Sequence, residues 1–168
     1  MESLKTVILS KAQIQQRINR IAYQVYEDNV DEQEIIIAGI AKSGFVFAKK
    51  IAEALKKISP LTISLIEVTI DKHSQVRKEI ELSIDREKLQ GKVIILVDDV
   101  LNSGKTLMYA LRPFLNADIK KIRTVVLVDR NHKRYPIAAD FVGMSLATTM
   151  QEHVTVEFES KEETVFLS

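Results

Sequence analysis

The chain has 168 residues, 46% of them hydrophobic and 28% charged, so we expect residues 1–168 to form a single globular domain. The net charge of +1 argues against a surface built mainly to bind nucleic acid or an anionic membrane, and the absence of cysteine excludes disulfides and thiolate metal sites. With no signal peptide or membrane span in the sequence, we expect a cytoplasmic protein that has no membrane partner.

The first part of the chain predicts helices alternating with strands. Ser10 and Gln13 form a capping-box pattern that begins a helix, and Pro60 ends a later one. In the strand that follows, the hydrophobic phase shifts between Leu65 and Ile66, which predicts a bulge or a bend. The predicted elements are a helix from Ser10 to about Asn29, a strand at 34–38, a turn at 39–44, a helix at 45–58 and a strand at 61–70.

A polar stretch at 71–78 has little to bury, and we expect a flexible loop there that joins antiparallel strands. It is a candidate lid that carries Lys72, although an exposed charged hairpin loop explains the pattern equally well. The later predicted elements are a strand at 80–84, an apolar strand that begins at 93 and runs into the carboxylates at 98 and 99, a strand at 123–128, a helix at 106–115, and short strands near 141, at 154–158 and at 164–167. Strands that alternate with helices predict an α/β fold with a mostly parallel sheet, helices on both faces, and ligands at the carboxyl ends of its strands.

The most informative segment is 93–106, Val-Ile-Ile-Leu-Val-Asp-Asp-Val-Leu-Asn-Ser-Gly-Lys-Thr. Asp98 and Asp99 follow a buried strand, where their carboxylates can accept hydrogen bonds from a ribose diol. The turn after them offers backbone N–H groups to a phosphate. The candidate phosphate-binding residues are Asn102, Ser103, Gly104, Lys105 and Thr106.

A nucleoside-triphosphate P-loop is the competing interpretation of Gly104-Lys105-Thr106. The first glycine of that motif would fall at Asp99, where a carboxylate would repel the phosphates that the loop must wrap. The P-loop is therefore excluded, and a structural turn with acidic residues that cap the helix is the remaining plain alternative.

A second glycine-bearing turn follows the strand at 34–38. Because both turns lie at carboxyl ends of parallel strands, they suit a substrate phosphorylated at both ends, such as phosphoribosyl pyrophosphate (PRPP). The candidate pyrophosphate-binding residues are Ala41, Lys42, Ser43 and Gly44. Amides and cations here, with Mg²⁺ held by the substrate, would stabilise a departing pyrophosphate, while the carboxylates would favour positive charge on the ribose.

The segment 93–106 closely resembles the PRPP signature of type I phosphoribosyltransferases. Nearly the whole chain resembles the bifunctional pyrimidine operon regulator/uracil phosphoribosyltransferase family. The matching segments are Lys5–Leu9, Arg20–Ala22, Gly39–Ile40, the signature, Leu127–His132 and Pro136–Gly143.

This resemblance implies a type I phosphoribosyltransferase fold with a small hood and a flexible hairpin loop, and an enzyme that transfers phosphoribose from PRPP to a base. Uracil is the base implied, with Mg²⁺ as cofactor and a homodimer or larger homo-oligomer as the assembly. By the same resemblance Asp98 and Asp99 hold the ribose, residues 102–106 the 5′-phosphate, residues 41–44 the pyrophosphate, and Phe141 and Val142 the base. Without the resemblance, Phe141 and Val142 would be interpreted as ordinary core.

The sequence departs from the family pattern near the base. Asn102 stands where purine-specific relatives place an aspartate, and an amide cannot act as a general base. Ala138 replaces a common lysine or arginine, and Ser43 replaces an arginine frequent in the uracil members. PRPP binding is compatible with all three changes. A PRPP- or nucleotide-sensing regulator of pyrimidine genes, with weak or no catalysis, is therefore the alternative function.

RNA binding is weakly supported by the sequence. Asn19 and Tyr23 occupy positions in the first helix that often hold threonine and histidine in the regulators, and the charge is nearly balanced. A basic cluster at 130–134 fits either RNA contact or a solvated turn. The three histidines, His73, His132 and His153, lack the spacing of metal ligands, and no protein-held metal site is expected.

Overall fold

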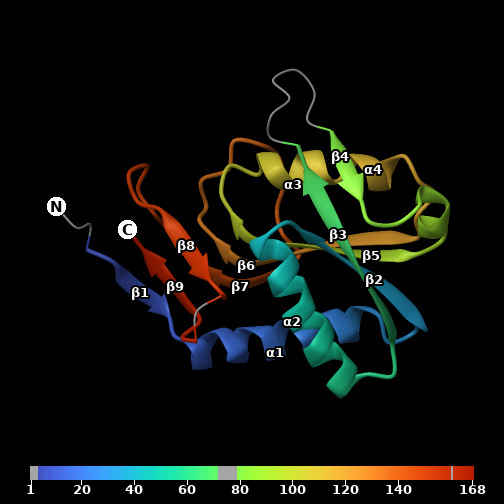
Figure 1. The fold of residues 1–168 in the computed structure, drawn as a ribbon, viewed down its shortest axis with the longest axis horizontal. Coiled ribbons are helices and arrows are strands. Elements are labelled where there is room, and N and C mark those ends of the chain that lie inside the picture. The colour runs from blue at the N-terminus through green and yellow to red at the C-terminus, as the bar shows by residue number, and fades with distance from the viewer. Residues whose placement is uncertain (1–3, 72–78, 160) are drawn as a thin grey trace.

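The computed structural model describes residues 4–71, 79–159 and 161–168. In this part of the chain a large sheet has the strand order β4-β3-β2-β5-β6-β7, and a smaller sheet has the order β1-β9-β8 (Figure 1). The large sheet contains β2 (Glu34–Ile40), β3 (Thr62–Ile70), β4 (Ile80–Leu82), β5 (Val93–Leu101), β6 (Lys121–Asp129) and β7 (Phe141–Ser145). The helices are α1 (Lys11–Asp28), α2 (Ser43–Ile58), α3 (Lys105–Ala110) and α4 (Arg112–Leu115), with a 3₁₀ turn η1 (Arg86–Leu89).

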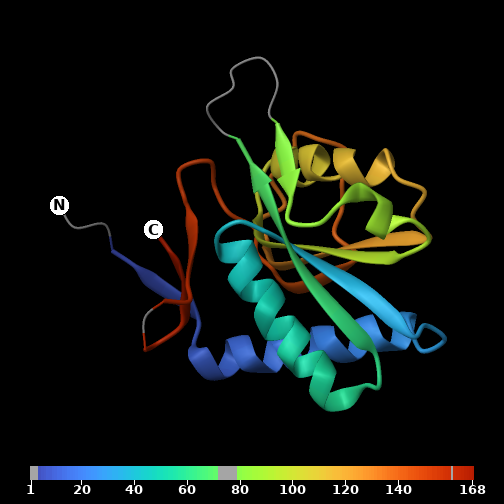
Figure 2. The same ribbon diagram turned by 45° about the vertical axis from the view of Figure 1, so that its right-hand side comes forward.

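The large sheet is parallel from β3 to β7, and only β4 at its edge pairs antiparallel. Alternate side chains of its central strands enter two separate cores, because successive residues of a strand point to opposite faces. One core lies under α1 and α2, and the other under α3, α4 and η1 (Figure 2). The predicted α/β sheet with helices on both faces is confirmed.

Of the two explanations for the phase shift between Leu65 and Ile66, the bulge is wrong. The pairing of β3 with β2 runs in unbroken register from Thr62 to Val68. Ile63 and Leu65 pack against the core beneath α2, whereas Ile66 and Val68 belong to the opposite core. The hydrophobic pattern of β3 changes phase because its first half is covered on the α2 face of the sheet and its second half on the opposite face.

The first helix follows the sequence prediction. The Ser10 Oγ accepts a hydrogen bond from the Gln13 backbone N–H at 3.3 Å, and the Gln13 side chain accepts one from the Ser10 N–H at 2.9 Å. The single helix predicted at 106–115 is instead divided into α3 and α4 around Leu111. Pro113, in the first turn of α4, lacks the N–H that a continuous helix would use, which explains the break.

The smaller sheet forms a hood beside the large one. It consists of β1 (Thr6–Leu9), β8 (Val154–Glu157) and β9 (Thr164–Leu167), so both ends of the described chain meet in it (Figure 1). The predicted hood is thus confirmed. The predicted antiparallel pairing around the hairpin loop is also confirmed by β3 and β4, while residues 72–78 of that loop lie outside the described residues.

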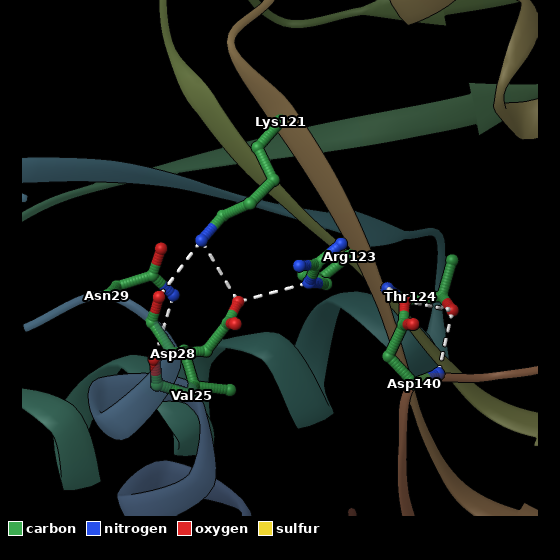
Figure 3. Close-up of polar contacts among 7 residues, drawn as sticks. All are labelled: Val25, Asp28, Asn29, Lys121, Arg123, Thr124 and Asp140. Carbon is green, nitrogen blue, oxygen red and sulfur yellow. Dashed lines mark hydrogen bonds and ion pairs between the residues drawn. The ribbon is translucent and has the colours of Figure 1, made fainter.

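The amino-end edge of the large sheet is closed by polar contacts (Figure 3). Asp28, the last residue of α1, pairs with Lys121 at 3.1 Å and Arg123 at 3.0 Å, both on β6. The Asp140 carboxylate accepts a hydrogen bond from the Thr124 backbone N–H at 2.8 Å, which positions β7 next to β6. None of the helices in the described ranges is long and apolar enough to span a membrane.

Candidate functional site

A pocket of about 270 Å³ lies at the carboxyl-end edge of the large sheet. It lies between β2 and β5, where the connections leave the sheet in opposite directions: β3 lies beyond β2 on one side, and β6 and β7 beyond β5 on the other. Such a switch point is where open α/β sheets bind ligands, because the loops diverge and leave a crevice. The pocket is lined by residues 40–44, Ile70, Asp98, Asp99, Val100, Asn102, Thr106 and Tyr109.

Two predicted carboxylates lie in the middle of this pocket. Asp98 is 8% exposed, and its Oδ1 accepts a hydrogen bond from the Asp99 backbone N–H at 2.9 Å. Asp99 is half-buried, and its Oδ1 accepts one from the Val100 N–H at 2.8 Å. These backbone contacts fix both side chains at the end of β5 while each still contributes to the pocket wall.

The turn after β2 forms one side of the pocket, and it contains a cis peptide bond between Ala41 and Lys42. The Ala41 N–H donates to the Val68 carbonyl oxygen at 2.9 Å, which ties the turn to β3. Gly44 is buried against β5, and a Cβ atom there would lie 3.0 Å from the Asp98 Oδ1. A side chain at position 44 would therefore push the turn away from the carboxylates.

The turn after β5 forms another side. Gly104 has a φ of +88°, and a Cβ there would lie 2.6 Å from the Ile137 Cγ2, so both conformation and space require glycine. The Ser103 carbonyl oxygen accepts hydrogen bonds from the N–H groups of Arg134 at 2.8 Å and Tyr135 at 3.0 Å. These contacts hold the turn open toward the pocket, to which Asn102 and Thr106 contribute directly.

The structure does not bring every predicted site residue to this pocket. Phe141 and Val142 are level with Val125 and Val126 in the middle of the sheet, and pack against the two cores rather than reaching its carboxyl-end edge. The carbonyl oxygens of Val142 and Gly143 instead accept hydrogen bonds from Arg20 at 3.2 and 2.6 Å. Lys72 lies outside the described residues. Ser103, Gly104 and Lys105 belong to the turn but not to the pocket lining.

Comparison with known proteins places this geometry in a family. Residues 6–163 match the model of the phosphoribosyl transferase domain. The chain belongs to the phosphoribosyltransferase family. It is 33% identical to a protein of Fusobacterium nucleatum subsp. nucleatum named bifunctional protein PyrR, over 99% of this chain and 100% of that one. A Brevibacillus brevis protein of the same name is 34% identical over 91% of this chain and 89% of its own.

Solved structures of phosphoribosyltransferases share the fold. The hypoxanthine phosphoribosyltransferase of Trypanosoma cruzi superposes with a TM-score of 0.78, over 95% of each chain and with 17% sequence identity. At that identity the likeness concerns the fold alone. The chain is therefore a phosphoribosyltransferase by family, a class of PRPP-dependent transferases, with the type I fold that its signature predicted.

Sequence reasoning missed the buried residue that borders this phosphoribosyltransferase pocket. The sequence predicts that Arg130 belongs to a basic cluster that contacts RNA or forms a solvated turn, yet its side chain is buried, with only 9% exposed. Its guanidinium donates to the Asn102 Oδ1 at 2.8 Å, to the Thr148 Oγ1 at 3.1 Å, and to the carbonyl oxygens of Thr149 and Glu152. The residues that bury Arg130 lie 18 to 22 positions further along the chain, so no local sequence pattern indicates its burial.

Proposed function

We propose that the protein transfers the 5-phosphoribosyl group of PRPP to a nucleobase, and that the base is uracil. The observation that carries the proposal is the pocket itself, because one crevice brings the turn after β2, the two carboxylates and the turn after β5 together. In the transfer, the bond from the anomeric carbon to pyrophosphate breaks. A base nitrogen takes that position and releases its proton to solvent.

The ribose fits between the two turns. Asp98 and Asp99 are anchored by backbone N–H groups, so their side chains keep a fixed position from which to accept hydrogen bonds from the ribose hydroxyls. As pyrophosphate leaves, the ribose gains oxocarbenium character, and the neighbouring carboxylates stabilise that positive charge. Binding and charge stabilisation thus come from the same pair.

The turn of residues 41–44 is assigned to the pyrophosphate. Its backbone approaches the carboxylates closely because Gly44 has no side chain, and Lys42 is exposed at the pocket rim to supply positive charge. Residues 102–106 are assigned to the 5′-phosphate, which their backbone N–H groups and the Thr106 side chain would hold. Both turns and the two carboxylates contribute residues to the same pocket, which supports a ribose phosphorylated at both ends as the ligand.

The pocket also fits the cofactor that PRPP chemistry implies. Hard carboxylate oxygens beside the pyrophosphate turn suit Mg²⁺, which prefers oxygen ligands and commonly shares them with substrate phosphates and water. The chemistry that Mg²⁺ supplies when bound there is neutralisation of the charge that develops on the departing diphosphate. The diphosphate and water would supply the ligands of this ion, and Asp98 and Asp99 would keep their contacts with the ribose hydroxyls.

The base is assigned to the β6 and β7 side of the pocket. Along the carboxyl-end edge, the pyrophosphate turn follows β2, the ribose carboxylates belong to β5, and Asn102 reaches toward β6 through its contact with Arg130. A base nitrogen that attacks the anomeric carbon from the face opposite the departing pyrophosphate therefore lies near the ends of β5, β6 and β7. The base-binding role of Phe141 and Val142 stays a prediction. Both residues pair with the middle of β6, so the carboxyl end of β7 lies nearer to the pocket edge than they do.

The enzymatic proposal is tested by pyrophosphate release. The protein is mixed with PRPP, MgCl₂ and one base at a time, and pyrophosphate is measured with uracil, cytosine, adenine, guanine and hypoxanthine. Release with uracil alone supports the proposal. Release with a purine alone would move the proposal to another base, and PRPP binding without release under any base would favour a sensor over an enzyme.

A second function, regulation of pyrimidine genes through RNA, is favoured by the relatives named bifunctional protein PyrR over nearly the whole chain. A groove of about 490 Å³ between α1 and α2 contains both residues that the sequence singled out, Asn19 and Tyr23, together with Lys50 and Lys57. We propose this groove as the RNA-facing surface. Filter binding to the protein's own operon leader at physiological salt tests it: saturable binding that Lys57→Gln weakens supports the role, and no saturable binding removes it.

We further propose that the protein works in the cytoplasm as a homodimer or larger homo-oligomer, as the family resemblance implies. Sedimentation at micromolar concentration measures the assembly. A monomer at every concentration would contradict it without affecting the pocket.

A further inference from the structure

We propose that Arg130 is a positioning residue that sets the hydrogen-bonding direction of Asn102, so that position 102 presents a donor to the base and selects bases that offer a carbonyl oxygen there. This inference rests on the proposed function, since it concerns the base end of the same pocket. It assigns a role to a residue that lies outside both signature turns.

The argument begins with the chemistry of the two side chains. A guanidinium has only N–H donors, so its contact with Asn102 requires the amide oxygen, and that oxygen accepts the Arg130 Nη1 at 2.8 Å. Asn102 is exposed and lines the pocket. Because the oxygen is turned toward Arg130, the amide directs its Nδ2 group, which carries two donors, to the other side.

Arg130 itself has little freedom to release the amide. Its backbone N–H donates to the Leu101 carbonyl oxygen at 3.1 Å, directly before Asn102, and its Nε donates to the Thr148 Oγ1. The carbonyl oxygens of Thr149 and Glu152 accept from the remaining nitrogen. The Thr149 N–H in turn donates to the Glu152 carboxylate at 2.6 Å. This hydrogen bond links the two residues whose carbonyl oxygens accept from the guanidinium.

The electrostatics agree with this arrangement. Hydrogen bonds from Thr149 lower the pKa of the Glu152 carboxyl, and the charges of Arg130 and His132 lower it further. The ionised Glu152 carboxylate therefore interacts favourably with the positive charge of the buried Arg130. An aspartate at position 102 would form an ion pair with the same guanidinium and would be a weak base, so proton abstraction at this position is disfavoured whichever of the two residues occupies it.

The consequence is a rule of selectivity. A donor at position 102 can bind a carbonyl oxygen or an unprotonated ring nitrogen, and it leaves a base N–H without a partner. The keto face of a pyrimidine offers carbonyl oxygens, which agrees with uracil. Specificity here depends on the orientation of the Asn102 amide, which Arg130, the residue directly after β6, determines.

The test separates base contact from general binding and needs no turnover. Calorimetry gives the dissociation constants of ribose 5-phosphate and of uridine monophosphate. The first constant divided by the second is the ratio that measures the contribution of the base. For Asn102→Ala we expect this ratio to fall about tenfold, the usual scale of a lost hydrogen bond. For Asn102→Asp, which keeps the shape but replaces the donor by an acceptor, we expect a fall at least as large.

The role of Arg130 is tested in the same assay. Arg130→Met is expected to lower the ratio as Asn102→Ala does, and the double variant to lower it no further, because the two residues act as one unit. Arg130→Lys, which keeps a cationic donor, is expected to recover most of the ratio. The control Thr148→Val breaks another contact of the same guanidinium but leaves that with Asn102, and should lower the melting temperature while leaving the ratio within about twofold.

The outcomes distinguish this inference from the proposed function. If the unchanged protein binds neither ribose 5-phosphate nor uridine monophosphate, the phosphoribosyltransferase pocket itself is wrong. If it binds both, and Asn102→Asp keeps the ratio, the donor role is overturned while the pocket stands. Two outcomes would make Arg130 only a structural residue. In the first, Asn102→Asp lowers the ratio but Arg130→Lys lowers it as much as Arg130→Met does. In the second, both arginine variants weaken the binding of the two ligands equally. Should Arg130→Met fail to fold, Arg130→Lys and the Asn102 variants decide.

Discussion

The two edges of the large sheet use carboxylates in opposite ways. At the amino-end edge, Asp28 binds the side chains of Lys121 and Arg123, and its charge is compensated within the protein (Figure 3). At the carboxyl-end edge, Asp98 and Asp99 are anchored through backbone N–H groups of neighbouring residues and line a polar pocket. The first arrangement stabilises the fold, and the second fixes side chains in place for a ligand.

The pKa of the Asp28 carboxyl reflects its contacts with Lys121 and Arg123. Burial raises the pKa of the Asp28 carboxyl, but hydrogen bonds from Lys121 and Arg123, together with the charges of both, outweigh burial and hold that pKa below its ordinary value. The folded state therefore favours the ionised carboxylate. The ion pairs of Asp28 thus stabilise the fold where that carboxyl is ionised.

The largest effect is expected at Asp99. Asp99→Asn should weaken PRPP binding by roughly 10- to 100-fold, because hydrogen bonds to a charged acceptor contribute about 1.5–3 kcal/mol each. The fold should persist, since Asp99 is half-buried at the pocket. Calorimetry with PRPP and MgCl₂ measures the affinity, with Asp28→Asn at the other edge as the matched control. Equal losses in the two variants would remove the distinction between the edges.

Gly104→Ala tests whether the phosphate turn depends on its backbone shape. The positive φ and the 2.6 Å approach of a Cβ to Ile137 should lower stability by about 1–3 kcal/mol and weaken ribose 5-phosphate binding by a larger factor than the control Gly91→Ala. Gly91 also has a positive φ of +71°, but a Cβ there meets nothing within 4 Å. Urea unfolding and calorimetry give both quantities, and similar binding in the two variants would mean that the turn tolerates a side chain.

Asp28→Asn should lower the free energy of unfolding by about 1 kcal/mol and leave PRPP affinity unchanged, because its partly exposed ion pairs lie at the far edge. The sign of the pH dependence follows from the lowered pKa. The extra stability is fully present above the unfolded pKa near 4 and is lost as the pH falls through the lower folded pKa. Urea unfolding at pH 7 and at pH 3 measures this. A difference from the unchanged protein that grows toward acid pH would contradict it.

The smallest effect is expected for the pair between Lys120 and Glu32 at the surface. The lysine side chain is 57% exposed, so Glu32→Gln should change stability by less than about 0.5 kcal/mol. Thermal unfolding checks this value. A loss as large as that of Asp28→Asn would show that the amino-end edge depends on its whole set of charges rather than on the Asp28 contacts.

Much of the fold could be predicted because its signals are local. The capping box of Ser10 and Gln13, the buried strand before Asp98, and the glycine after each of two strands are patterns within a few residues, and each led to the right element. Both glycine turns and the two carboxylates then met in one pocket, because parallel strands bring their carboxyl ends to a single edge. The sequence pattern failed in β3, where a change of covered face looks the same as a bulge.

By itself, the sequence determined the strands, the two glycine-bearing turns and the carboxylates at the end of β5, since each depends on neighbours along the chain. Only the tertiary structure decided which residues border the base end of the pocket. Phe141 lies level with Val125 because of strand pairing, and Arg130 is buried because Thr148, Thr149 and Glu152 return to it from about 20 residues away. Contacts between segments that are distant along the chain leave no periodic pattern in it. The residues next to Arg130 in the sequence therefore do not show whether its side chain is buried or solvated.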